Sequence, residues 1–158
     1  MTTLTTVDFI IRIALAIGLG TLVGLERTLA GKTAGMRTYA MVTLGSCLFI
    51  LISQIVLSTI PNPALANPLL ISSAIITGIG FIGAGLVIFQ SDKITGLTTA
   101  AGLWVSAGVG TASGFGFFTL ATVATVAALF VFTLMWFIEN FLKKYSYNNE
   151  NNHDKQQN

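Results

Sequence analysis

The sequence predicts an all-α integral membrane protein, a bundle of about five transmembrane helices with the N-terminus outside and the C-terminus cytoplasmic. The 158-residue chain is 53% hydrophobic and only 9% charged, which suits a bilayer as solvent. Its apolar residues form five long segments, and a helix of about 20 residues crosses the ~30 Å hydrocarbon core. Charged residues lie mostly at the ends of these segments, where they indicate orientation.

The five segments run over residues 8–25, 38–58, 69–89, 97–114 and 117–138. No basic residues precede the first segment, so we expect a retained spanning helix and not a cleaved signal peptide. The fourth segment is rich in Gly, Ala, Ser and Thr, a composition that favours burial among neighbouring helices.

The links between segments support this division. All three prolines fall within residues 61–68 and separate the second and third segments, while residues 90–96 and 114–116 form the next two links. We expect a transmembrane domain over residues 1–142 and a polar, disordered tail over residues 143–158.

Basic residues are distributed unevenly over the two sides of the predicted bundle. Five crossings put the links 26–37 and 90–96 and the tail on one side, with every basic residue except Arg12: Arg27, Lys32, Arg37, Lys93, Lys143, Lys144 and Lys155. The positive-inside rule makes that side cytoplasmic. Arg12 follows Asp8 by four residues, a spacing that allows pairing, and we expect Arg12 to snorkel to the outer interface.

Small residues recur at four-residue spacing in three segments: Ala16, Gly20 and Gly24; Gly110 and Gly114; Ala124 and Ala128. Such stripes predict packing seams, because close backbone contact drives helix association in lipid. Residues 78–83 match the dinucleotide pattern G-x-G-x-x-G, but they lie inside an apolar run and Asp92 follows too soon. We instead expect close approach or a bend at these positions: Gly78, Gly80, Gly83, Ala84 and Gly85.

The sequence holds no recognisable catalytic or metal-binding pattern. There is no G-x-S-x-G and no H-E-x-x-H, Cys47 is alone, and His153 lies in the tail. We therefore expect no enzyme activity, no cofactor, no metal site and no nucleic-acid binding. Hydroxyl groups offer a polar path, but they more often bond to a carbonyl one turn earlier: Thr43, Ser46, Ser72, Ser73, Thr77, Thr98, Thr99 and Ser106.

Two residues stand out on physical grounds. Glu26 ends the first helix, where the macrodipole disfavours a carboxylate, so we predict a forked pair with Arg37, which begins the second helix. The alternative is that this link is simply a solvated cationic anchor. Trp104 lies about 10 Å into the fourth helix, which predicts a packed core aromatic whose indole N–H finds an acceptor. Trp136 fits an ordinary interfacial belt.

Three motif blocks follow one another along the chain. The first holds Gly24-Leu25-Glu26-Arg27, Lys32 and Ala34-Gly35-Met36-Arg37-Thr38; the second is the glycine run 78–85; the third is Gly96-Leu97-Thr98-Thr99 with Trp104. Together they resemble the MgtC/SapB family of bacterial inner-membrane proteins over about residues 8–140. The resemblance implies these functional residues: Glu26, Arg27, Lys32, Gly35, Arg37, Thr38, Gly80, Gly83, Gly85, Thr98, Thr99 and Trp104.

The resemblance implies a non-enzymatic five-helix protein of the bacterial inner membrane, linked to growth in low magnesium. One role it suggests is contact with another membrane complex such as the F-type ATP synthase. The other reading is a small transporter or channel for Mg²⁺ or another ion, lined by the third and fourth helices. Both functions are compatible with a homo-oligomer. Thr28, Leu29 and Gly102 depart from the family pattern, and a short polar tail stands where many members continue into a soluble domain.

Overall fold

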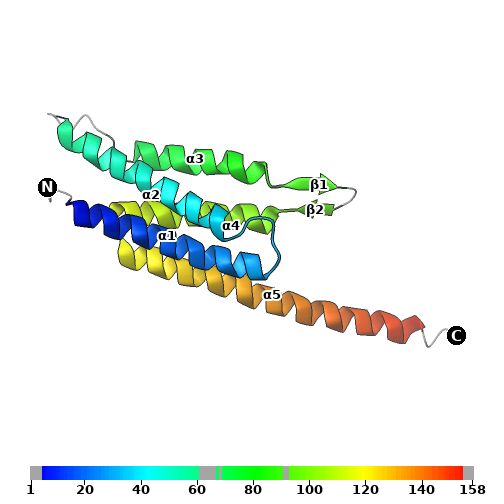
Figure 1. The fold of residues 1–158 in the computed structure, drawn as a ribbon. Helices are drawn as coiled ribbons and strands as arrows, with labels where there is room; N and C mark the ends of the chain where they lie inside the picture. The colour runs from blue at the N-terminus through cyan, green and yellow to red at the C-terminus, as the bar shows by residue number, and fades with distance from the viewer. Residues whose placement is uncertain (1–4, 61–66, 68, 91–92, 155–158) are drawn as a thin grey trace.

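The computed structural model describes residues 5–60, 67, 69–90 and 93–154, and within these the fold is helical apart from one short hairpin. The helices form one bundle (Figure 1) and have these bounds: α1 Thr6–Leu29, α2 Met36–Thr59, α3 Leu70–Ala84, α4 Leu97–Phe115 and α5 Phe118–Asp154. The predicted all-α membrane fold is confirmed.

Three helices of the described chain are long and apolar enough to cross a bilayer, namely α1, α2 and residues 118–138 of α5. Helix α3 is apolar but has 15 residues, about 22 Å at 1.5 Å per residue. Helix α4 has 19 residues and is rich in small and hydroxylated side chains. The protein is therefore membrane-embedded, and five separate crossings stay a prediction.

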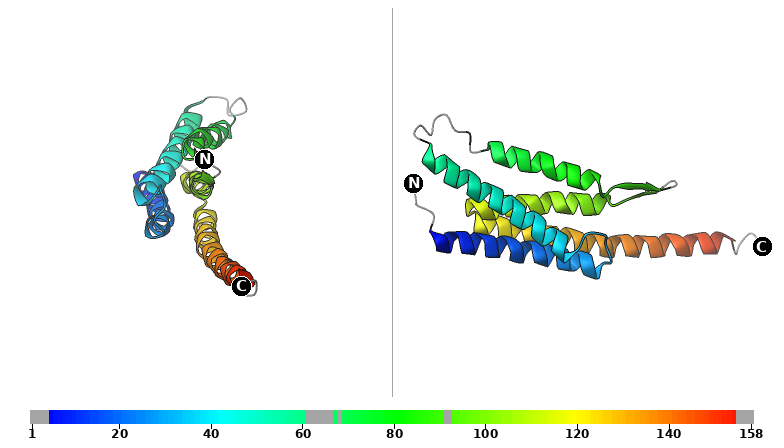
Figure 2. Two further views of the ribbon diagram at one scale, coloured as in Figure 1. Left: turned by 90° about the vertical axis from the view of Figure 1, so that its right-hand side faces the viewer. Right: turned by 45° about the horizontal axis from the view of Figure 1, so that its top comes forward.

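Helix α4 lies at the centre of the bundle. It contacts α1, α2, α3 and α5, and the end-on view in Figure 2 shows it surrounded by them. Its buried residues are mostly small and include Gly102, Ser106 and Gly110. The expectation that the fourth helix is buried among its neighbours is confirmed, because small side chains let four helices approach it closely.

The predicted packing seams of α1 and α4 converge on Thr43 of α2. A Cβ atom added at Gly20 or at Gly110 would lie within 3.0 Å of Thr43 atoms. The Thr43 hydroxyl donates to the carbonyl of Tyr39 at 3.2 Å, the one-turn back-bonding expected from the sequence. Any larger residue at either glycine would push α1 or α4 away from α2.

Helix α3 ends earlier than predicted. It stops at Ala84 and not at residue 89, and a hairpin of β1 (Ile88–Gln90) and β2 (Lys93–Thr95) occupies the end of the predicted third segment and most of the predicted link. Ile88 pairs with Thr95 in antiparallel register, and β-branched residues favour strands. Gly96 then takes a φ of +88°, and a Cβ there would collide with the Leu86 carbonyl group, so the return into α4 requires glycine.

Helix α5 continues beyond the predicted boundary. Residues 143–154 were expected to be disordered, yet the helix runs on to Asp154. This stretch holds neither glycine nor proline, so no residue in it terminates the backbone hydrogen-bonding pattern. Residues 155–158, with Lys155, lie outside the described chain.

The two ends of the bundle differ in charge, as the sequence predicts. The α1–α2 connection, the hairpin and the C-terminal part of α5 all lie at one end (Figure 1). We call this the basic end, because it holds Arg27, Lys32, Arg37 and Lys93. The N-terminus and the α4–α5 turn lie at the opposite end. Pro61, Pro63, Pro68 and Asp92 fall outside the described residues.

Candidate functional site

The three motif blocks meet at the basic end of the bundle. The first block ends α1 and begins α2, the second ends α3, and the third begins α4. A Cβ at Gly83 would lie 3.4 Å from the Ala100 side chain, which places the second block against the third. The hydroxyl of Tyr39 in α2 donates to the Thr99 carbonyl at 3.4 Å, which ties α2 to the third block.

An ion pair between adjacent residues holds the centre of this site. The Arg27 guanidinium donates to both carboxylate oxygens of Glu26, with Nη2 to Oε1 at 2.9 Å and Nε to Oε2 at 2.5 Å. The Arg27 side chain is 3% exposed and that of Glu26 is 20% exposed. Glu26 does have the cationic partner that its place at the end of α1 demands. The prediction that this partner is Arg37 was wrong: Arg37 is exposed, and both carboxylate oxygens of Glu26 accept from Arg27.

Phe132 of α5 covers the same guanidinium. The Arg27 Cζ atom lies 3.9 Å from the centroid of the Phe132 ring, within the range of a cation–π interaction. Nothing in the sequence singled out Phe132, since it is one of several phenylalanines in an apolar helix. A buried arginine needs both a counter-charge and a polarisable surface, and this site supplies both.

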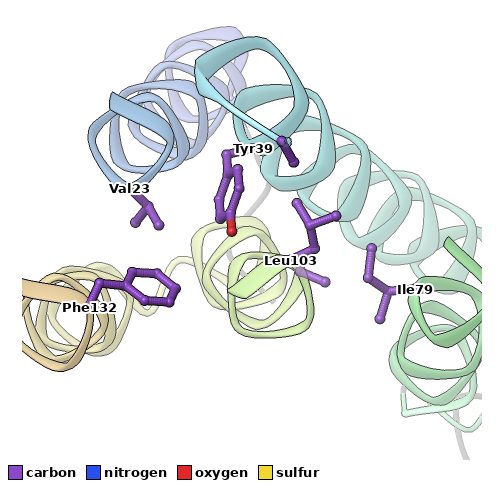
Figure 3. Close-up of a cluster of buried hydrophobic side chains, with 7 residues drawn as sticks. Val23, Tyr39, Ile79, Leu103 and Phe132 are labelled. Carbon is purple, nitrogen blue, oxygen red and sulfur yellow. The ribbon is translucent and has the colours of Figure 1, made fainter. Parts of the chain in front are cut away.

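Tyr39 extends this cluster into the core, where it packs with Val23, Leu103 and Phe132 (Figure 3). The packing depends on Gly102, the residue noted as a departure from the family pattern. A Cβ there would lie 2.7 Å from the Phe132 ring and would also collide with the Tyr39 hydroxyl. The absent side chain therefore makes the space that both aromatic rings occupy.

Thr28, the second noted departure, joins α1 to α2. Its hydroxyl donates to the Gly24 carbonyl at 2.9 Å and accepts a hydrogen bond from the Met36 backbone N–H at 3.1 Å. Gly35 occupies the N-cap position of α2 and has no side chain to serve as a cap. Thr28 provides the missing acceptor from the preceding helix. A Cβ at Gly35 would collide with this hydroxyl.

The remaining motif residues do not join this cluster. Exposed side chains or backbone are found at Lys32, Arg37, Thr38, Gly80 and Thr98, and Gly85 is the C-cap of α3. Close approach or a bend was predicted for the glycines of the second block. Gly83 makes a close approach to α4, whereas an added Cβ at Gly78 or Gly80 would meet nothing within 4 Å, so neither makes a close contact within the bundle.

Trp104 lies on the outer side of α4, which corrects the prediction of a packed core aromatic. It is 55% exposed, whereas its neighbour Leu103 is fully buried. Ala100, one turn earlier on α4, packs on Gly83, so Trp104 borders the seam between α3 and α4. Gly80, one turn before Gly83 on α3, is also exposed and borders the same seam. We call Gly80 and Trp104 the α3–α4 surface.

A second polar cluster occupies the opposite end of the bundle. The Arg12 guanidinium Nη1 donates to the Gly114 carbonyl at 2.7 Å and to Gln54 Oε1 at 3.0 Å. The prediction that Arg12 pairs with Asp8 or snorkels outward is therefore wrong. The Asp8 carboxylate instead accepts from the Thr5 backbone N–H at 2.8 Å in a capping box. Arg12 turns inward because Gly114, at the C-terminal end of α4, offers a free carbonyl.

Within the described residues, no three potential ligands among His, Cys, Asp and Glu lie close enough together to hold a metal ion. In this basic-end site, the Glu26 carboxylate neutralises Arg27, and the contacts around the pair hold five helices together. The accessible surface of this site includes Arg37, Lys32 and the α3–α4 surface.

The MgtC family model matches residues 13–141, nearly all of this bundle. The chain belongs to the MgtC family. It is 38% identical to the Escherichia coli protein named "Putative magnesium transporter YhiD" over 128 residues, which cover 80% of this chain and 60% of that protein. It is 40% identical to Protein MgtC of Salmonella typhimurium over 121 residues, or 77% of this chain and 49% of that one.

An uncharacterised protein of Haemophilus influenzae is 34% identical over 139 residues, 85% of this chain and 58% of that protein. The chain thus spans about half to three fifths of the length of these relatives. No solved structure matches the chain significantly.

Proposed function

We propose that this protein is a non-enzymatic, multi-pass protein of the bacterial inner membrane that supports growth in low magnesium by binding another integral membrane protein. The observation that carries the proposal is the division of the family motifs into two groups. Arg27, Gly83 and Thr99 are buried and build the bundle, while Gly80 and Trp104, which border the seam between α3 and α4, are exposed.

The α3–α4 surface suits a transmembrane helix as partner. Gly80 leaves open space for close backbone approach, and the exposed Trp104 offers a large aromatic side chain across the seam. Interfaces within membranes are rich in such small residues, and tryptophan is enriched among residues that dominate binding energies. The family resemblance names the F-type ATP synthase as one candidate partner.

Photocrosslinking in native membranes tests this proposal. A photoreactive amino acid at Trp104 should capture a defined membrane protein, identified by mass spectrometry. The same group at Leu22, an exposed position on α1, should not capture it. Capture from both positions, or from neither, would contradict a partner at the α3–α4 surface.

The alternative function is transport of Mg²⁺ or another cation. The observation in its favour is that Ser106, buried in α4, has no hydrogen-bond partner among the described residues. Purified protein reconstituted in liposomes with a Mg²⁺-sensitive dye decides between the two. Protein-dependent flux that is lost in Ser106→Ala would favour transport, while absence of flux together with specific capture would favour partner binding.

A further inference from the structure

An apolar groove of about 690 Å³ runs between α2 and α3. Its walls include Met41, Val42 and Phe49 of α2 and Ile71, Ile75 and Ile82 of α3. The groove exists because α2 and α3 contact each other only sparsely, and because Gly45 and Gly78 contribute no side chains to its walls. Its volume falls in the range of about 300–1,000 Å³ that is usual for small-ligand sites.

The groove has the depth of one leaflet. From Thr38 to Phe49 it follows α2 for about 16 Å at 1.5 Å per residue, roughly half of the ~30 Å hydrocarbon core. It begins at the basic end, where Thr38 lies two residues into α2. A single flexible hydrocarbon chain fits a groove of this length and volume.

The groove begins at the end of the bundle that carries exposed basic residues. Arg37 immediately precedes Thr38 and is exposed, and Lys32 in the α1–α2 connection and Lys93 in the hairpin are also exposed. Figure 1 shows that connection and the hairpin at the same end. Glu26, at this end, is already paired with Arg27. The Arg37 guanidinium is therefore available to an anion, and its fork of donors suits a phosphate group.

We infer that this groove binds one acyl chain of an anionic phospholipid from the leaflet at the basic end, with the lipid phosphate at Arg37. The inference rests on the membrane location and not on the proposed partner binding, because the groove and the α3–α4 surface use different sides of α3. The ligand class is a glycerophospholipid with a net negative headgroup.

Native mass spectrometry of the purified protein with phosphatidylglycerol or phosphatidylethanolamine tests the chain-binding part. Gly78→Leu and Gly45→Leu each place a side chain in the groove, where an added Cβ meets nothing within 4 Å. Gly18→Leu is the matched control, because it also has open space but lies on α1, outside the groove. We expect phosphatidylglycerol affinity to fall about fivefold or more in both groove variants and to stay unchanged in Gly18→Leu.

Equal lipid binding by all four proteins would overturn the inference. A wild-type dimer that becomes monomeric in both groove variants, without loss of lipid, would also overturn it and would identify the groove as a contact between copies. Circular dichroism checks that the variants fold, and two independent groove positions keep the test valid if one variant fails.

Arg37→Gln tests the headgroup part. We expect the preference for phosphatidylglycerol over phosphatidylethanolamine to fall about fivefold, the effect of one basic residue near an anionic headgroup. Lys32→Gln removes the same charge from the α1–α2 connection and should have a smaller effect. An unchanged preference in Arg37→Gln would overturn the assignment of the phosphate to this side chain.

Discussion

Two arginines are turned into the bundle at its opposite ends, and the protein accommodates them in different ways. Arg27 is neutralised by the Glu26 carboxylate and covered by the Phe132 ring. Arg12 has the Gly114 carbonyl and the Gln54 amide oxygen as partners, both uncharged, and its Nε has no partner among the described residues. Each guanidinium lies at the C-terminal end of a helix, where the macrodipole favours a cation: Arg27 at the end of α1 and Arg12 at the end of α4.

The difference indicates two separate roles. The Arg27 pair is electrically neutral and almost closed to solvent, so it functions as a structural anchor for α1 and α5. Arg12 keeps its net charge and binds the C-terminal end of α4, so it connects α1, α2 and α4 through weaker, uncharged acceptors. We therefore expect the free energy of unfolding to fall more when Arg27 loses Glu26 than when Arg12 loses one of its acceptors.

The largest effect is expected for Glu26→Gln. It leaves the buried Arg27 without a counter-charge and should lower the free energy of unfolding by about 3 kcal/mol. Reversible unfolding in mixed micelles measures this. The double variant Glu26→Gln with Arg27→Met should be more stable than Glu26→Gln alone, because it removes the unpaired charge. A double variant less stable than the single one would contradict the anchor role.

The next effect is expected at the Arg12 cluster for Gly114→Ala. The new Cβ would lie 2.7 Å from the Ile50 Cβ, so α4 must shift and take its carbonyl away from Arg12. Such overpacking should cost about 1–3 kcal/mol. Gly108→Ala is the control on the same helix, with nothing near its Cβ, and it should be neutral or slightly stabilising. Equal effects of the two substitutions would argue against the close contact.

A smaller effect is expected for Gln54→Leu. It removes one acceptor from Arg12 but leaves the 2.7 Å bond to Gly114, so the free energy of unfolding should fall by about 1 kcal/mol. Combined with Arg12→Met, the Gln54→Leu substitution should cost less than it does alone. Strict additivity of the two would show that the Arg12–Gln54 hydrogen bond contributes nothing.

The smallest effect is expected for Arg37→Gln, because its side chain is exposed and makes no ion pair with Glu26. Stability should change by less than about 0.5 kcal/mol, and the coupling energy with Glu26→Gln should be zero within error. A coupling above about 1 kcal/mol would restore the Glu26–Arg37 pair predicted from the sequence.

The sequence predicted the segments well because hydrophobicity and length are local properties. It placed α1, α2 and α4 to within a few residues and predicted the burial of α4 from its small residues. It missed the hairpin after Ala84, since the apolar run 85–89 has the composition of a helix continuation. It also missed the extension of α5 to Asp154, since polarity alone indicated disorder.

The candidate site was predicted less completely. Glu26 was identified as needing a partner, and Arg37 was chosen because it begins the second helix and can form a forked pair, although the adjacent Arg27 was also within reach. Phe132 and Gln54 were not recognised at all, because their contacts join residues far apart in the chain. Trp104 was placed in the core although α4 presents Leu103 there instead.

By itself, the sequence determined that this protein is a helical membrane bundle of the MgtC family with its basic residues concentrated at one end. Composition and motif order suffice for that, because the bilayer requires long apolar helices whatever their packing. Only the tertiary structure decided which arginine meets which acceptor, which glycines are contacts, and where the α2–α3 groove opens. Those outcomes depend on how helices distant in sequence approach one another. Close packing of small residues sets that approach, and it cannot be inferred from local sequence.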